Sequence, residues 1–216
     1  MSLVKIYAAL KAQLQTVPAI VPNAALASVA TGASAVFTTT AAHGLVTGMS
    51  VRLPGYTAGN PLLDGVYLVV VTGTTTFYLQ NSATKNPITV IIPGSGGSVS
   101  ANLTGERNSL YQPVIGVPYQ LVDLVSFKPE EPTQGGGFYQ EHGVFQVTLV
   151  YPVGIGLGAI LARAELIRGY FKKGSSYSLG GVTVLIPETP QFGGSIPTEE
   201  SIALPVKIGY LANIFS

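Results

Sequence analysis

The sequence predicts an α+β fold, in which two main helices pack on a mixed or antiparallel sheet and an all-β module, barrel- or sandwich-like, is inserted. Apolar residues recur at helical spacing near the N-terminus and again in residues 157–173. Short alternating segments rich in Val, Thr and Tyr lie between glycine-rich turns. The composition also changes along the chain, because residues 24–105 carry few formal charges: Arg52, Asp64 and Lys85.

The first expected element is an amphipathic helix close to the N-terminus. Its apolar residues fall at helical spacing and its polar residues lie elsewhere. Ser2 is expected to cap the start of this helix, and Pro18 to end it. The apolar positions are Leu3, Ile6, Tyr7, Leu10 and Leu14.

The weakly charged region is expected to form short strands joined by tight turns. Thr72-Gly73 marks one hairpin, and the Gly/Ser-rich residues 93–105 are expected to be a linker that leaves the module. The expected strands are residues 35–40, 50–53, 65–71, 75–80 and 88–92.

After residue 105 the chain alternates longer strands with a second helix. A polar Pro/Gly loop, residues 128–138, separates the first two strands, and Lys172-Lys173-Gly174 is a suitable helix end. The expected strands are residues 118–127, 143–151, 180–186 and 202–211. The expected apolar stripe of the helix is Leu157, Ile160, Leu161, Ala164, Ile167 and Phe171. Residues 1–24 and 106–216 are therefore predicted to form one discontinuous α+β body, and residues 25–105 the inserted β module.

The composition favours a self-assembling protein over a nucleic-acid or membrane binder. Charged residues make up 10% of the 216 residues, against about a quarter in typical soluble domains. A surface so poor in charge is expected where much of it is buried against other subunits. The net charge of +1 indicates no strong field for nucleic acid or acidic lipid, and no apolar run reaches the length of a membrane span. We expect a soluble protein made in a cytoplasm.

His43, in the stretch HGLVTGMSVR, is the first candidate for a catalytic residue. A catalytic histidine needs a nucleophile or substrate within reach and usually an orienting carboxylate. Asp64, about twenty residues away, is the acid that this region offers. Gly44 and Gly48, which both follow it, instead favour a tight turn and then a second turn, and the imidazole is expected to cap the turn backbone.

The segment Gly154-x-Gly156-x-x-Ala159 has the form of a dinucleotide-binding turn. Pro152 interrupts the preceding strand, and Glu188 lies further downstream than such a site requires. The strand also alternates apolar and polar residues, as half-exposed antiparallel strands do. A flexible strand-to-helix turn is the favoured interpretation.

The remaining charged residues do not form a recognisable catalytic or metal-binding set. Glu130 and Glu131 are adjacent in an extended segment, so their side chains point apart. His142 has no second histidine or cysteine at metal-ligand spacing. The sequence thus predicts no enzyme, cofactor or metal.

The residues outside the module resemble a known family. The features are the strand GVFQVTLVYP, the glycine-rich turn VGIGLG, and a helix that ends in FKKG. Their order is similar to that of the tail terminator-like proteins of long-tailed (siphovirus-type) bacteriophages. The module itself resembles small β-barrels found within phage tail proteins.

This resemblance implies a structural virion protein. Such a protein would form a ring, usually a hexamer, at the head-proximal end of the tail tube, end tube polymerisation and take part in head–tail joining. Its partners would be further copies of itself, the tail tube protein and a head-completion or neck protein, assembled in the host bacterial cytoplasm. The residues expected to contact a neighbour or the tube are Glu130, Glu131, Gln134, Phe138, Tyr139, Arg163, Arg168 and Lys172.

Three other functions remain open from the sequence. The chain could be another tail or neck component, such as a tube or tail completion protein. It could be a dinucleotide-binding enzyme that uses the Gly154–Ala159 turn, or it could bind glycans through the module.

Overall fold

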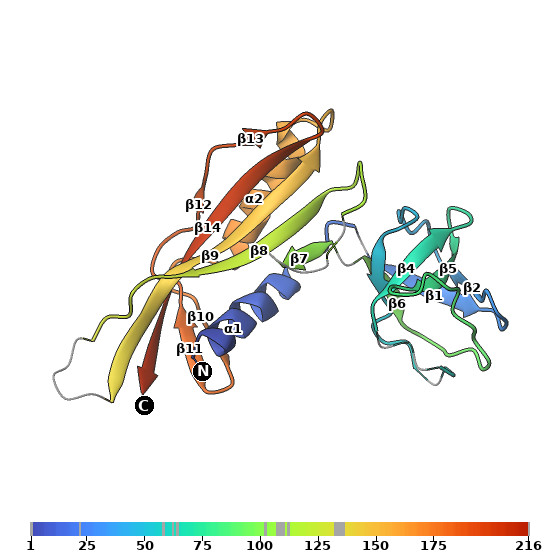
Figure 1. Cartoon of the computed structure of the whole chain (residues 1–216), viewed down its shortest axis with the longest axis horizontal. Coiled ribbons are helices and arrows are strands. Elements are labelled where there is room, and N and C mark those ends of the chain that lie inside the picture. The colour runs from blue at the N-terminus through green and yellow to red at the C-terminus, as the bar shows by residue number, and fades with distance from the viewer. Residues whose placement is uncertain are drawn as a thin grey trace. The chain divides into compact units, whose positions relative to one another are not determined.

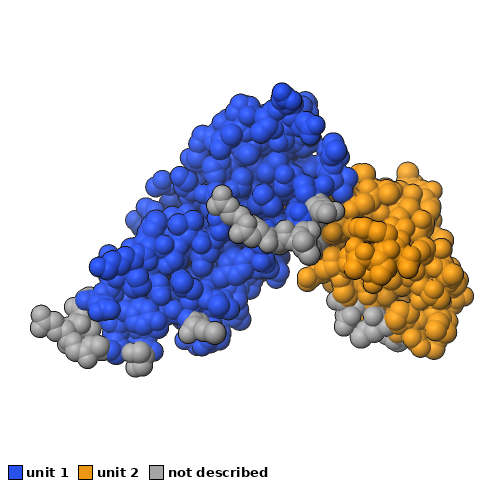
Figure 2. Space-filling model, in the orientation of Figure 1, with its two compact units in different colours: residues 1–18, 104–216 blue, residues 19–103 orange. Residues whose placement is uncertain are grey.

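The computed structural model divides into two compact units, coloured separately in Figure 2. Unit 1 comprises Met1–Pro18 and Thr104–Ser216, and unit 2 comprises Ala19–Leu103. The structure describes residues 2–21, 23–57, 59–61, 63, 65–101, 103–106, 111, 113–131 and 137–215.

Unit 2 is a closed barrel of six strands, which confirms the predicted inserted β-barrel. The strands follow the order β1-β2-β5-β4-β3-β6 around the barrel, and every neighbouring pair is antiparallel. Alternate side chains point inward and fill the interior: Phe37, Val51, Val69, Phe77, Leu79 and Val99 are at most 1% exposed. The strands are β1 (Ala24–Val29), β2 (Val36–Thr39), β3 (Ser50–Arg52), β4 (Tyr67–Val71), β5 (Thr76–Asn81) and β6 (Ser98–Ala101).

Three details of the module differ from the prediction. β1 was not expected, because its alanines have little strand propensity. β6 lies within the expected linker, where Val99 fills the core and the strand closes the barrel by pairing with β1 and β3. Residues 88–92 form isolated bridges instead of a strand, at Val90 with Gly32 and at Ile92 with Asn60.

Unit 1 is built on a mixed sheet of eight strands (Figure 1). The strand order is β10-β11-β14-β9-β8-β7, and β12 and β13 pair with β14. β7 and β8 are parallel, and the other pairs are antiparallel. The strands are β7 (Thr104–Glu106), β8 (Tyr119–Ser126), β9 (Phe138–Pro152), β10 (Ser176–Leu179), β11 (Val182–Leu185), β12 (Gln191–Phe192), β13 (Ile196–Pro197) and β14 (Ser201–Phe215).

Two helices, α1 (Ser2–Thr16) and α2 (Leu157–Tyr170), cover one face of this sheet. Side chains on this face of β9, such as Phe145 and Leu149, pack with the helices in one core. The buried stripe of α2 is rotated from the predicted one, since Leu157 and Leu161 are 51% and 43% exposed. Arg163, expected on the outer surface, is only 8% exposed. The α+β class thus fits a chain that is mostly β with two helices.

Local details at two element ends also differ from the prediction. Gly180 and Gly181 form the two-residue turn of a β10–β11 hairpin, with φ of 59° and 81°, so the expected strand 180–186 begins inside a turn. Ser2 is itself the first residue of α1. Its hydroxyl donates to Glu141 and accepts from Tyr139, which ties the start of the helix to β9.

Candidate assembly surface

The face of the unit 1 sheet opposite the helices is a surface that the fold leaves open for a partner. Directly paired residues of antiparallel strands share a face, so the register defines its rows. Val125, Val144 and Gly209 form one row across β8, β9 and β14. His142 and Leu211 form the next row, beside Phe127. These rows are mostly apolar, and neither of the two helices packs against them.

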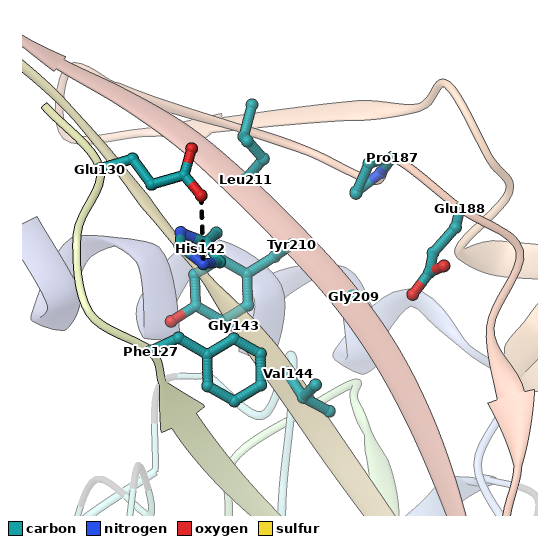
Figure 3. A pocket seen from close by; sticks show the side chains of 10 residues that line it. All are labelled: Phe127, Glu130, His142, Gly143, Val144, Pro187, Glu188, Gly209, Tyr210 and Leu211. Carbon is teal, nitrogen blue, oxygen red and sulfur yellow. Dashed lines mark ion pairs between the residues drawn. The ribbon is translucent and has the colours of Figure 1, made fainter. Parts of the chain in front are cut away.

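A groove of about 270 Å³ is hollowed into this open face (Figure 3). Its lining comes from β9, β14, the segment after β8 and the loop after β11. The lining residues are Phe127, Glu130, His142, Gly143, Val144, Pro187, Glu188, Gly209, Tyr210 and Leu211. Two carboxylates, those of Glu130 and Glu188, therefore flank an otherwise largely apolar surface.

The segment after β8 forms one wall of the groove. Phe127 N–H donates to the His142 carbonyl at 3.0 Å, and Glu130 exchanges two backbone hydrogen bonds with Gln140, of 2.8 and 3.0 Å. The Phe127 ring meets the His142 ring edge-on, with 5.7 Å between centroids. Glu130 Oε1 lies 4.0 Å from His142 Nε2, and its side chain is 69% exposed. The wall is thus held by backbone pairing, while the carboxylate faces solvent.

Two glycines shape the other parts of the groove. A Cβ at Gly209 would lie 3.0 Å from Glu188 Oε1 and 3.3 Å from its Cγ, so glycine there lets Glu188 rest on β14. A Cβ at Gly143 would collide with the backbone carbonyl of Val125 and lie 2.8 Å from the Tyr210 hydroxyl. The close approach of β8, β9 and β14 at the groove therefore depends on glycine.

The structure places the predicted contact residues in several regions of unit 1. Glu130 lines the groove, and Glu131 is exposed beside it. Phe138 pairs with Phe215 at the end of the β9–β14 ribbon, with 5.2 Å between ring centroids. Tyr139 donates to Ser2 Oγ on the helix face. Gln134 lies outside the described residues.

The predicted basic contacts on α2 are largely engaged within the chain. Arg168 Nη1 donates to Glu165 Oε1 at 3.0 Å, and its Nε donates to the Pro190 carbonyl at 3.2 Å. Its guanidinium also lies 3.7 Å from the centroid of the Phe192 ring. Lys172, just beyond the helix, is exposed.

Arg163 was expected to face a neighbouring subunit, and this placement on the surface is wrong. Its guanidinium donates to the Pro18 carbonyl and, at 3.1 Å, to Gln120 Oε1. Gln120 Nε2 in turn donates to Thr104 Oγ1 at 2.8 Å. Burial lowers the pKa of Arg163, an effect that Tyr151 opposes. The helical spacing from Ile160 and Ile167 could have revealed its inward position.

His43 has the structural role that the sequence predicted. Its Nδ1 accepts the Leu45 N–H at 3.0 Å, and the ring is 3% exposed. It packs edge-on against Phe77 in the barrel core, with 5.5 Å between centroids. The prediction that His43 caps a turn is confirmed.

The Gly154–Ala159 turn does not stand in a dinucleotide-binding fold. Gly154 and Gly156 have φ of 93° and 82°, and α2 begins directly after them. The preceding strand, β9, is antiparallel to both neighbours, β8 and β14. Dinucleotide-binding folds place this turn after a strand of a parallel sheet.

In the described part of the chain, no three His, Cys, Asp or Glu side chains are grouped as metal ligands would be. Neither described helix combines the length and apolarity needed to cross a membrane.

Comparison with known proteins bears on the same unit. The model of a family described as phage tail terminator protein matches residues 105–210. The chain is a tail terminator-like phage protein. The matched residues contain β8, β9, α2 and the strands up to β13, together with most of β14. Tail terminator proteins are structural components of the phage tail. Membership in this family therefore implies that the chain interacts with other tail or head proteins.

Two further comparisons add little to this likeness. One solved structure is 19% identical and aligns with a TM-score of 0.41. The alignment covers 52% of this chain and 80% of that one, and at this score it carries no argument. The comparison with curated proteins gave no significant match.

Proposed function

We propose that this tail terminator-like chain forms a closed ring of six copies at the head-proximal end of a phage tail tube. In this position it ends polymerisation of the tube and presents the surface on which a head-completion or neck protein joins. The ring is assembled in the host bacterial cytoplasm and remains in the virion. The family match over residues 105–210 is the observation that carries the proposal.

The surface of unit 1 supports assembly. A ring is held by heterologous contacts, so each copy must cover two different patches. Unit 1 offers the open sheet face with its groove and, elsewhere, the exposed outer surface of α2. Val125 and Phe127 leave 42% and 49% of their surface exposed beside the groove. Apolar side chains gathered in this way are typical of interaction sites.

The barrel is proposed to decorate the ring. Its strands close on themselves, so no strand edge of the barrel is left open for pairing with another copy. The family match also begins after it, at residue 105. Assembly is therefore assigned to unit 1.

Native mass spectrometry and negative-stain microscopy of the purified protein test the ring. We expect one discrete mass, six times that of the 22.4 kDa chain, and particles with a central hole. Open filaments of variable length would instead indicate a tube protein, and a chain that stays monomeric at high concentration would refute assembly.

Phage particles test the place of the ring. Virions made without this chain should carry tails of variable length that fail to join heads, and supplying the chain in trans should restore both properties. Normal tail length without the chain would rule out termination.

A further inference from the structure

The groove on the open face has the size and chemistry of a site for a single basic side chain. Its volume of about 270 Å³ lies just below the ~300–1,000 Å³ of small-molecule sites. Phe127, Val144 and Leu211 give it an apolar surface, and Figure 3 shows Glu130 and Glu188 on opposite sides of it. A lysine places its aliphatic stem on apolar surface while its ammonium group reaches a carboxylate.

Both carboxylates are available to a partner. Glu130 is largely exposed, and its contact with His142, at 4.0 Å, lies at the outer limit of an ion pair. Glu188 makes no hydrogen bond or ion pair with the described residues, and the glycine at position 209 lets it lie along the groove. The described lining of the groove contains no lysine or arginine, so its two carboxylates can accept a cation from outside.

Among the cations of unit 1, Lys172 and Lys173 are the pair best suited to enter it. Lys11 pairs with Glu106 on the helix side of the sheet. Arg163 is buried, and Arg168 is bound by Glu165, Pro190 and Phe192. Five exposed lysines of unit 1 make no ion pair with the described residues: Lys5, Lys128, Lys172, Lys173 and Lys207. Of these five, Lys172 and Lys173 are the two that are adjacent in sequence and present two ammonium groups together.

These two lysines cannot reach the groove of their own copy. They follow α2, which covers the helix face of the sheet, whereas Val144, Gly209 and Leu211 lie on the opposite face. A contact between the end of α2 and the groove must therefore join two copies. It uses two different patches, as each contact of a closed ring does.

We propose that the Glu130–Glu188 groove receives one lysine side chain of the Lys172–Lys173 pair of a second copy of this chain, while the other lysine lies at its acidic rim. This inference rests on the proposed ring and specifies one of its contacts. Opposite charges at such a contact fix which surfaces meet, and like charges there are strongly unfavourable.

A charge swap tests the contact. The groove variant Glu130→Lys/Glu188→Lys and the helix variant Lys172→Glu/Lys173→Glu should each raise the dissociation constant of the ring on the order of tenfold or more. The variant that combines all four changes should restore it. Native mass spectrometry measures the ring fraction, and circular dichroism checks that each monomer is folded.

Matched controls separate this contact from general effects of charge. Glu199→Lys/Glu200→Lys changes an adjacent, exposed acidic pair in the turn before β14 and should leave the ring intact. If a charge reversal prevents folding, the neutral pairs Glu130→Gln/Glu188→Gln and Lys172→Met/Lys173→Met provide the same test, with a smaller loss of the ring. Raising the salt concentration should also weaken the wild-type ring.

The outcomes distinguish the two proposals. A wild-type ring that tolerates the groove variant, or folded variants that the fourfold combination fails to rescue, would overturn this contact and leave the ring standing. A wild-type chain that forms no ring would overturn both.

Discussion

A sheet has two faces and two edges that must be buried, paired or left exposed, and the two units of this chain differ in how they do this. Unit 2 closes its six strands into a barrel, so that one face is the core and the sheet edges pair with each other. Unit 1 leaves its sheet open, covers one face with two helices and leaves the other to solvent. The described strands of the barrel thus leave no sheet edge unpaired, whereas the sheet of unit 1 has an uncovered face and two edge strands, β10 and β7.

The two units also differ in how far apart in sequence the hydrogen-bond partners of their buried polar groups lie. In the barrel, His43 bonds the backbone two residues away. In unit 1, Arg163 bonds Pro18, 145 residues away in the sequence, and its partner Gln120 bonds Thr104. Pro18 and Thr104 are the points at which the chain leaves and re-enters unit 1. Long-range polar contacts therefore close unit 1 across the insertion.

If each unit has its own core, one core substitution in each should act on that unit alone. Phe77 and Phe171 are both fully buried, the first in the barrel and the second in unit 1. Replacing either by alanine should cost about 3–5 kcal/mol of unfolding free energy. Two thermal transitions are expected by calorimetry, and each variant should lower only one of them. A joint shift of both would show that the units unfold together.

Gly143, one of the two glycines that line the groove, provides the next test, which is specific to the open sheet of unit 1. Gly143→Ala places a methyl group against the Val125 carbonyl, which is fixed by strand pairing. We expect a loss of about 1–3 kcal/mol in the unfolding free energy of unit 1 and no change in the barrel. Gly169→Ala in α2 is the matched control, because nothing lies within 4 Å of its added Cβ. The control should be neutral or stabilising, by up to ~1 kcal/mol.

Loss of the Arg163 guanidinium should weaken the closure of unit 1. Arg163→Leu leaves the Pro18 carbonyl and the Gln120 side-chain oxygen without their donor. An unsatisfied buried polar group costs about 1–3 kcal/mol, so denaturant unfolding should show a loss in this range. Arg168→Leu, on the more exposed side of the same helix, should cost less. Equal losses would contradict the special place of Arg163.

The sequence predicted those elements whose signal is local and strong. The long helices and the central strands of both units carry clear periodicity, and the glycines around His43 indicated its turn. β1 and β6 were missed because Ala and Ser dominate them, and because their pairing is decided by closure of the barrel.

The candidate groove could not be predicted in the same way. It joins four segments that are far apart in sequence, and only the strand register brings them together. Glu130 was singled out for its charge, whereas Glu188 gained its place from the glycine opposite it. Arg163 was misplaced because a charged side chain was assumed to face solvent.

Alkaline pH should act on unit 1 through its tyrosines. Burial, with a smaller effect of Tyr119, raises the pKa of Tyr111 to about 12. Burial likewise raises the pKa of Tyr151, Tyr177 and Tyr210. Because the folded pKa exceeds the unfolded value of about 10, the stabilisation is complete below pH 10 and is lost as the pH rises towards 12. Tyr111→Phe should make the unit 1 transition less sensitive to pH between 10 and 12, measured by calorimetry.

Removal of the barrel should have the smallest effect on unit 1. We expect that replacing residues 19–103 by a short Gly-Ser linker leaves the unit 1 transition within a few degrees of its original temperature, because its core and the Arg163 contacts lie outside the excised segment. The same protein should still form the proposed ring, since the groove and the end of α2 are retained. A linker variant that also carries Arg163→Leu should be destabilised further, because the contacts to Pro18 then no longer hold the two chain ends. If excision alone unfolds unit 1, the barrel is part of its stability, and the contrast between a self-sufficient module and an open assembly unit fails.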